Sequence, residues 1–90
     1  MADSFRGAVR VIGDDGILLT TGSANLAADP EMGSWEGTLE TYIGTGVAGK
    51  ALVVDLEIPG SGRGRAQLTP DRVSGEMAIS HVVGLGPTFF

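Results

Sequence analysis

Cysteine is absent from this chain, and histidine occurs only once, at His81. Without cysteine the fold has no disulfide bonds, and zinc or iron–sulfur sites built on cysteine are excluded. A single histidine also excludes a metal site made from several imidazoles of one chain. We therefore expect no metal and no cofactor, and the missing cysteine fits the reducing cytoplasm.

Charged residues are scarce too, at 19% of the 90 residues, against roughly 25% in an average globular protein. Acidic residues outnumber basic ones by 11 to 6, which gives a net charge of −5. Phosphate backbones repel such a chain unless its basic residues gather in one patch, and only Arg63 and Arg65 lie close together in the sequence. We therefore expect no nucleic-acid partner.

Long apolar runs are missing as well, since none approaches the ~20 residues that cross a bilayer. The N-terminal residues lack the basic and apolar regions of a signal peptide. The length predicts one domain over residues 1–90. We expect a cytoplasmic protein without a membrane partner.

The apolar residues that are present recur at every second position, which indicates β-strands. Glycine, proline and aspartate separate six such runs: 5–11, 17–28, 34–43, 51–58, 65–69 and 73–83. Gly22, inside the long second run, predicts a bulge or bend. The sequence thus predicts an all-β fold, a six-stranded antiparallel meander that closes into a small barrel or a strongly twisted sheet.

Two turns follow the fourth run, one over residues 59–63 and one over residues 69–72. Across the first turn, pairing Glu57 with Arg65 sets polar residues opposite polar ones and apolar residues opposite apolar ones. This register makes Asp55 and Glu57 an exposed, charge-compensated pair, although two carboxylates at this spacing also occur in glycosidases.

The segment GTGVAGK, residues 44–50, contains the spacing G-x-G-x-x-G and most of a phosphate-binding loop. Both motifs require a helix after the loop, because the helix N-terminus binds the phosphates. The residues that follow, ALVVDLEI, instead alternate like a strand. We therefore interpret the segment as a hairpin loop between two strands, with Lys50 facing solvent.

Four residues are candidates for contacting a ligand: His81, Tyr42, Trp35 and Met77. His81 is in phase with the apolar residues Met77, Ile79 and Val83, and a buried histidine can act as an acid or a base. Trp35 and Tyr42 lie on opposite faces of one strand, so we place Trp35 in the core and Tyr42 at a rim or interface. The terminal pair Phe89 and Phe90 is expected to pack on a barrel end.

Several turn and core motifs also resemble a known protein family. They are Asp29-Pro30 leading to Gly33, WEGTL at 35–39, AGK at 48–50, RAQLT at 65–69, and Val83-Gly84 followed by Gly86. Together they resemble a bacterial all-β domain of unknown function, found alone or appended to flavin-containing monooxygenases. The resemblance implies a small β fold with an auxiliary role and supplies no catalytic residue.

No nucleophile motif accompanies His81, and this favours a non-catalytic binding or interaction module. Such a module would hold an apolar small molecule or dock with an enzyme. Two alternatives stay open. One is a small cofactor-free enzyme that acts on a hydrophobic substrate, with His81 as acid or base and Tyr42 or Glu40 assisting. The other is a structural homo-oligomer, a homodimer in its simplest form, whose β edges pair.

Overall fold

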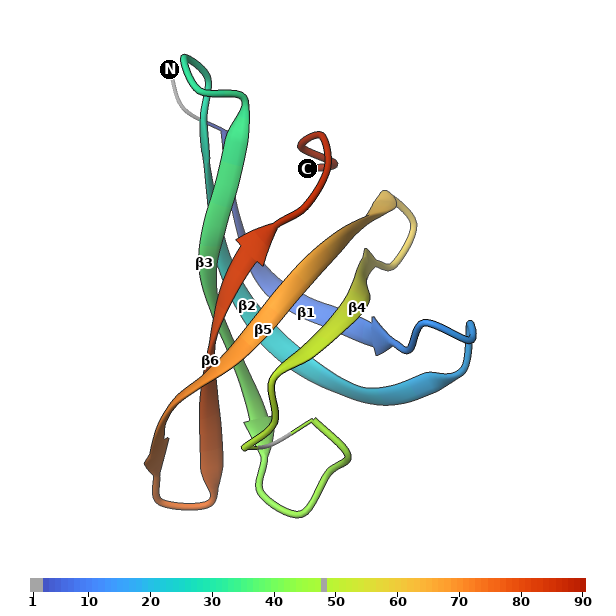
Figure 1. Cartoon of the computed structure of the whole chain (residues 1–90), viewed down its shortest axis with the longest axis vertical. Coiled ribbons are helices and arrows are strands. Elements are labelled where there is room, and N and C mark those ends of the chain that lie inside the picture. The colour runs from blue at the N-terminus through green and yellow to red at the C-terminus, as the bar shows by residue number, and fades with distance from the viewer. Residues whose placement is uncertain (1–2, 48) are drawn as a thin grey trace.

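The structure, a computed structural model, describes residues 3–47 and 49–90. Ala48 of the glycine-rich segment, and Met1 and Ala2, lie outside the described residues. The strands are β1 (Ser4–Ile12), β2 (Leu18–Asp29), β3 (Ser34–Tyr42), β4 (Leu52–Ile58), β5 (Gly62–Ser74) and β6 (Met77–Gly84). All neighbouring strands are antiparallel and close into a barrel (Figure 1). The predicted all-β fold of six antiparallel strands is confirmed.

The strand order around the barrel is β1-β2-β3-β6-β5-β4. It consists of two three-stranded meanders, joined where β3 pairs with β6 and where β1 pairs with β4. The order departs from a simple meander at one connection, because β3 and β4 are not neighbours. The segment between them runs across one end of the barrel (Figure 1). We call this the loop end; the other end, with both chain termini, is the aromatic end.

The interpretation of residues 44–50 as a hairpin loop was therefore wrong, although no helix follows them. After β3, the amide of Ile43 donates to the carbonyl of Glu76 in the β5–β6 turn, 2.9 Å away. The chain then crosses the barrel, and Val47 inserts among the buried core residues with 0% of its surface exposed. Burial of this valine fixes the path of the segment.

Alternate residues of every strand point into the barrel and fill it. The buried residues include Trp35 and Leu39 from β3 and Val54 and Leu56 from β4, as the strand periodicity predicted. The fully buried apolar side chains further include Val9, Val11, Leu26, Leu68 and Val82. The interior is thus a packed hydrophobic core.

The predicted sixth strand, 73–83, is interrupted, and its inner face was assigned wrongly. A two-residue turn at Gly75 and Glu76 separates β5 from β6, since Ser74 pairs with Met77. Gly75 has φ of 62°, as the first central position of a type II′ hairpin turn requires. In β6 the inward residues Ala78, Ser80 and Val82 are at most 3% exposed; Ile79, on the opposite face, is also buried, at 9%.

The turn expected at residues 69–72 is instead a β-bulge inside β5. The pairing register shifts between Pro70 and Arg72, and the strand continues on both sides of the shift. Proline lacks an amide donor, so a bulge tolerates it as well as a turn does. The consequence is a β5 strand of 13 residues in place of the short strand expected there.

The β4–β5 hairpin has the predicted faces but a register two residues away. Asp55 pairs with Arg65 and Glu57 with Arg63, where the sequence predicted Glu57 opposite Arg65. The amide of Ser61 donates to the carbonyl of Ile58, 3.0 Å away, so the turn uses three residues instead of five. Pro59 followed by Gly60 at φ 79° suits this tighter turn.

The aromatic end is closed by Trp35, Phe89 and Phe90. Their rings make edge-to-face contacts, with centroids 5.2 to 5.8 Å apart. The Trp35 Nε1–H donates to the carbonyl of Gly86 at 3.1 Å. The Trp35 ring also lies against Gly84, in space that a larger residue would occupy. The prediction that the terminal phenylalanines pack on a barrel end is confirmed.

Candidate functional site

The structure does not bring the four predicted ligand residues into one site. Trp35 belongs to the core at the aromatic end, with 1% of its surface exposed. His81 lies on the outer wall, in the middle of β6. Tyr42 and Met77 are direct partners in the β3–β6 pairing, close to the loop end. Three separate environments must therefore be considered.

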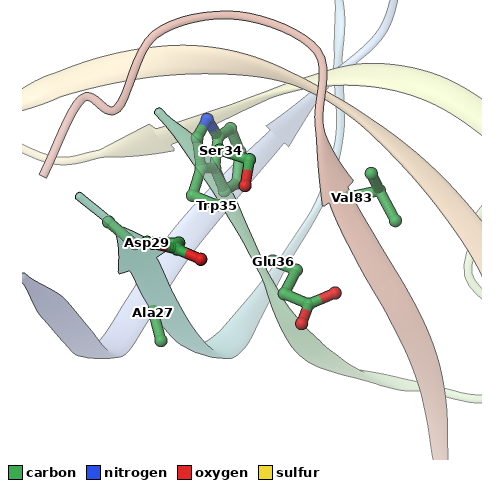
Figure 2. A pocket seen from close by; sticks show the side chains of 7 residues that line it. Ala27, Asp29, Ser34, Trp35, Glu36 and Val83 are labelled. Atoms are coloured by element: carbon green, nitrogen blue, oxygen red, sulfur yellow. The ribbon is translucent and has the colours of Figure 1, made fainter. Parts of the chain in front are cut away.

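The first environment is a hollow of about 300 Å³ beside Trp35, on the outside of β2 and β3. Figure 2 shows the side chains that line it, among them Trp35, Asp29 and Glu36. Asp29 already accepts hydrogen bonds from the amides of Glu31 and Met32, at 3.0 and 3.3 Å, and so shapes the β2–β3 turn. Because the Trp35 indole N–H also donates within the chain, both of these polar groups, Asp29 and the indole, serve the fold.

The second environment surrounds His81, which was expected on the inner face and points outward. Its side chain is 47% exposed, and its Nε2 lies 4.0 Å from a carboxylate oxygen of Glu36. The neighbours of His81 in the sheet are Thr38 on β3 and Thr69 on β5. This histidine is solvated and lies outside the barrel, which does not favour the role of a buried acid or base.

The third environment is a notch where β2 and β3 separate. Their pairing begins at Ser23 and Glu40, so residues 18–22 of β2 have no partner on β3. A hollow of about 280 Å³ opens at this point. We call it the Tyr42 notch; its lining residues are Ala8, Thr21, Gly22, Ser23, Glu40, Thr41, Tyr42 and Met77.

The Tyr42 notch combines an apolar surface with polar groups at its rim. Tyr42 is 63% exposed and lies opposite Met77, so an aromatic ring and a thioether are neighbours. The carboxylate of Glu40 is on the same face of β3, two residues away, or about 6.7 Å along the strand. Thr21 and Ser23 on β2 are exposed and bring two hydroxyl groups to the same lining. The notch can therefore offer both apolar contact and hydrogen bonds to a small molecule.

The sequence identified Tyr42, Met77 and Glu40 but missed the β2 side of the notch, Thr21 and Ser23. The available signal was Gly22, which the sequence placed at a bend. A Cβ atom on Gly22 would lie 2.5 Å from the carbonyl oxygen of Glu40, so only glycine fits there. This close approach occurs at the point where the two strands separate.

The carboxylates Asp55 and Glu57 form an ion-pair network on the outer wall. Glu57 contacts Arg10 at 3.2 Å and Arg63 at 3.0 Å, and Asp55 contacts Arg65 at 3.6 Å. Hydrogen bonds from Arg63 and then Arg10 hold the pKa of Glu57 below its usual value of 4.5. The interpretation of these carboxylates as a charge-compensated surface is confirmed, with Glu57 paired to different arginines.

No group of three or more acidic or histidine residues is arranged to hold a metal ion within residues 3–47 and 49–90. Over the same residues, no helix is long and apolar enough to cross a membrane. No protein family model matches the chain, and neither curated protein sequences nor solved structures give a match. The resemblance to the domain found with flavin-containing monooxygenases therefore stays a prediction.

Proposed function

We propose that this protein is a non-catalytic binding module that holds an apolar small molecule in the Tyr42 notch. One observation carries the proposal. The barrel interior is filled by its own side chains, whereas Tyr42 and Met77 leave apolar surface exposed beside an open hollow. Ligand sites combine such apolar walls with a few polar groups.

The dimensions of the notch limit the ligand. A hollow of about 280 Å³ lies near the lower end of the range for small-molecule sites, roughly 300–1,000 Å³. A single aromatic or aliphatic ring suits this space. One ring face would stack on Tyr42, while the hydroxyls of Thr21 and Ser23 meet a polar substituent.

Amide chemical-shift mapping tests this proposal, with benzyl alcohol as a neutral single-ring probe. We expect saturable shifts at Thr21, Ser23 and Tyr42, and none at the Trp35 hollow. Tyr42→Ala should abolish these shifts. Val83→Ala removes an exposed apolar residue elsewhere on the wall and is the matched control. Shifts of equal size over the whole surface, or no saturation, would count against the proposal.

A second candidate function, the structural homodimer, is supported by the edge of β2. Residues 18–22, the part of β2 without a partner on β3, contain no charged residue, although the chain as a whole carries −5. Their exposed members include Leu18 and Leu19, and the preceding Ile17 is exposed too. Native edge strands are ordinarily protected by charge or proline, so an unprotected edge favours pairing with a second copy.

Sedimentation velocity at micromolar concentration separates the two candidates. A homodimer that Thr20→Lys converts to a monomer would support edge pairing, because the lysine places a charge on that edge. Thr38→Lys, on the wall of β3, is the matched control. If the original chain and both variants are monomers, edge pairing is contradicted, and the binding module is the candidate function that remains.

The remaining hypothesis, a cofactor-free enzyme, receives less support from the geometry. His81 pairs with Thr38, and Tyr42 lies four residues further along β3, about 13 Å by the rise of a strand. Glu40 lies two residues from Thr38, about 7 Å along the same strand. Neither Tyr42 nor Glu40, the two helpers considered, is therefore assembled with His81. We further propose a cytoplasmic, auxiliary role in a bacterial oxidation system, supported by the absence of cysteine and by the resemblance given above.

A further inference from the structure

We infer that the Tyr42 notch selects a ligand with a positive charge, a small organic ammonium compound with a ring. This inference rests on the proposed binding function and adds the chemical class of the ligand. The residues that carry it are Glu40, Tyr42 and Met77, all of which line the notch.

The charge of the notch comes from Glu40. Its neighbours across the sheet, Ser23 on β2 and Ile79 on β6, are uncharged. Within the described part of the chain, no basic group lies within ion-pair distance of the Glu40 carboxylate. This differs from the carboxylates of the β4 wall, Asp55 and Glu57, which are both compensated by arginines. Glu40 is therefore available to a cation from outside the chain.

Arg6 is the basic residue to consider as a competitor. It lines a separate hollow next to the notch, and that hollow also includes Glu40. Arg6 is on β1, two strands away from Glu40, because β2 lies between β1 and β3. It does not line the Tyr42 notch, and within residues 3–47 and 49–90 no Lys, Arg or His does so. The notch therefore presents a single charged group, and that group is negative.

The apolar residues complete the selection for a cation. The face of an aromatic ring attracts an ammonium group, and Tyr42 is exposed enough to present its ring. Met77 supplies a polarisable contact for the apolar body of the ligand. An anionic ligand would meet both Glu40 and the net charge of −5 and would be repelled.

Three probes of similar shape test the inference: benzylammonium, benzyl alcohol and benzoate. Their dissociation constants are measured from the amide shifts of Thr21 and Tyr42 at low salt. We expect benzylammonium to bind about five- to tenfold more tightly than benzyl alcohol, which is the range of an exposed ion pair plus a cation–π contact. Benzoate should give no saturable shift. Raising the salt concentration should weaken benzylammonium and leave benzyl alcohol unchanged.

Glu40→Gln isolates the charge, because it keeps the size of the side chain. We expect this variant to lose the part of the preference for benzylammonium that comes from the ion pair, and to keep only the smaller part that comes from the Tyr42 ring. Glu36→Gln is the matched control, since Glu36 lies on the same face of β3 and does not line the notch. It should keep the preference for the cation.

The outcomes separate the inference from the function on which it rests. Equal affinity for the cation and the alcohol in the original chain overturns the charge selection and leaves the binding module intact. A preference for benzylammonium that is undiminished in Glu40→Gln also overturns it. If none of the three probes moves the notch amides, the proposed function itself fails.

Discussion

The two ends of the barrel are closed in different ways. At the aromatic end three rings pack edge to face, and an indole hydrogen bond ties them to the C-terminal segment. At the loop end a single buried side chain, Val47, enters the core from a connecting segment. Several apolar residues there stay in solvent, with Tyr42 63%, Ile43 51% and Val73 66% exposed.

From this difference we infer that the aromatic end contributes mainly to the stability of the fold, and we propose that the loop end contributes to binding. The aromatic end buries large rings, and the ion pairs between β1, β4 and β5 lie next to it. The loop end instead contains the split between β2 and β3 and therefore the Tyr42 notch. A small barrel buries a limited core, so exposed apolar residues cost stability unless a partner or ligand covers them.

The largest effect is expected when the aromatic end is opened. Trp35→Ala removes a fully buried ring and should lower the free energy of unfolding by about 3–5 kcal/mol. Urea unfolding followed by circular dichroism measures the loss. Tyr42→Ala, at the loop end, removes an exposed ring and should cost less than about 1 kcal/mol. Equal losses in both variants would contradict the division between the two ends.

A smaller effect is expected at the loop end itself. Val47→Ala deletes two buried methyl groups and should cost about 1–2 kcal/mol, measured by the same urea unfolding. Its neighbour Ile43 is larger but exposed, so Ile43→Ala is the matched control and should cost less. If Ile43→Ala lowered the free energy of unfolding more than Val47→Ala does, the proposal that Val47 closes this end would be contradicted.

The smallest effect concerns the ion pairs next to the aromatic end, and it depends on pH. Because its pKa is lowered in the folded state, Glu57 stabilises the fold above the usual carboxyl pKa of 4.5. This contribution is lost as the pH falls through the lowered value. Glu57→Gln should therefore have a lower free energy of unfolding than the original chain at pH 7. This difference in free energy should disappear as the pH falls below 4.5.

Urea midpoints at a series of pH values measure that difference, and Glu76→Gln, an exposed glutamate at the loop end, is the control. Added salt at pH 7 should reduce the difference, because exposed ion pairs are screened. A difference that persisted at low pH would mean that Glu57 acts through its packing and not through its charge.

The sequence predicted the class of fold because the apolar residues of β3 and β4 lie mainly on one face, with Tyr42 and Val53 as exceptions. In β6 both faces carry apolar residues, Ala78 and Val82 on one and Ile79 and Val83 on the other. The alternation alone therefore could not decide which face points into the barrel.

Local sequence patterns could not predict which strands pair when they lie far apart in the chain. Residues 44–50 look like a hairpin loop in isolation, and only the pairing of β3 with β6 shows that the strands before and after them are not neighbours. The same holds for the candidate site. Tyr42 and Met77 were identified as single residues, but their contact depends on the β3–β6 register. Thr21 joins them because the pairing of β2 with β3 ends at Ser23 and Glu40, just before it.

The short seam between β1 and β4 also has a consequence for the folding rate. Three residue pairs complete the ring there, and the ion pair across it joins residues 47 positions apart in the sequence. Joining such distant segments requires the chain entropy of a long loop to be lost before any contact forms. We therefore expect closure of this seam to be a late event, and an all-β chain of this kind to fold in milliseconds to seconds. The same seam has the fewest residue pairs of the six strand pairings described, so we expect the ring to open there first, which hydrogen exchange of the β1 and β4 amides would measure.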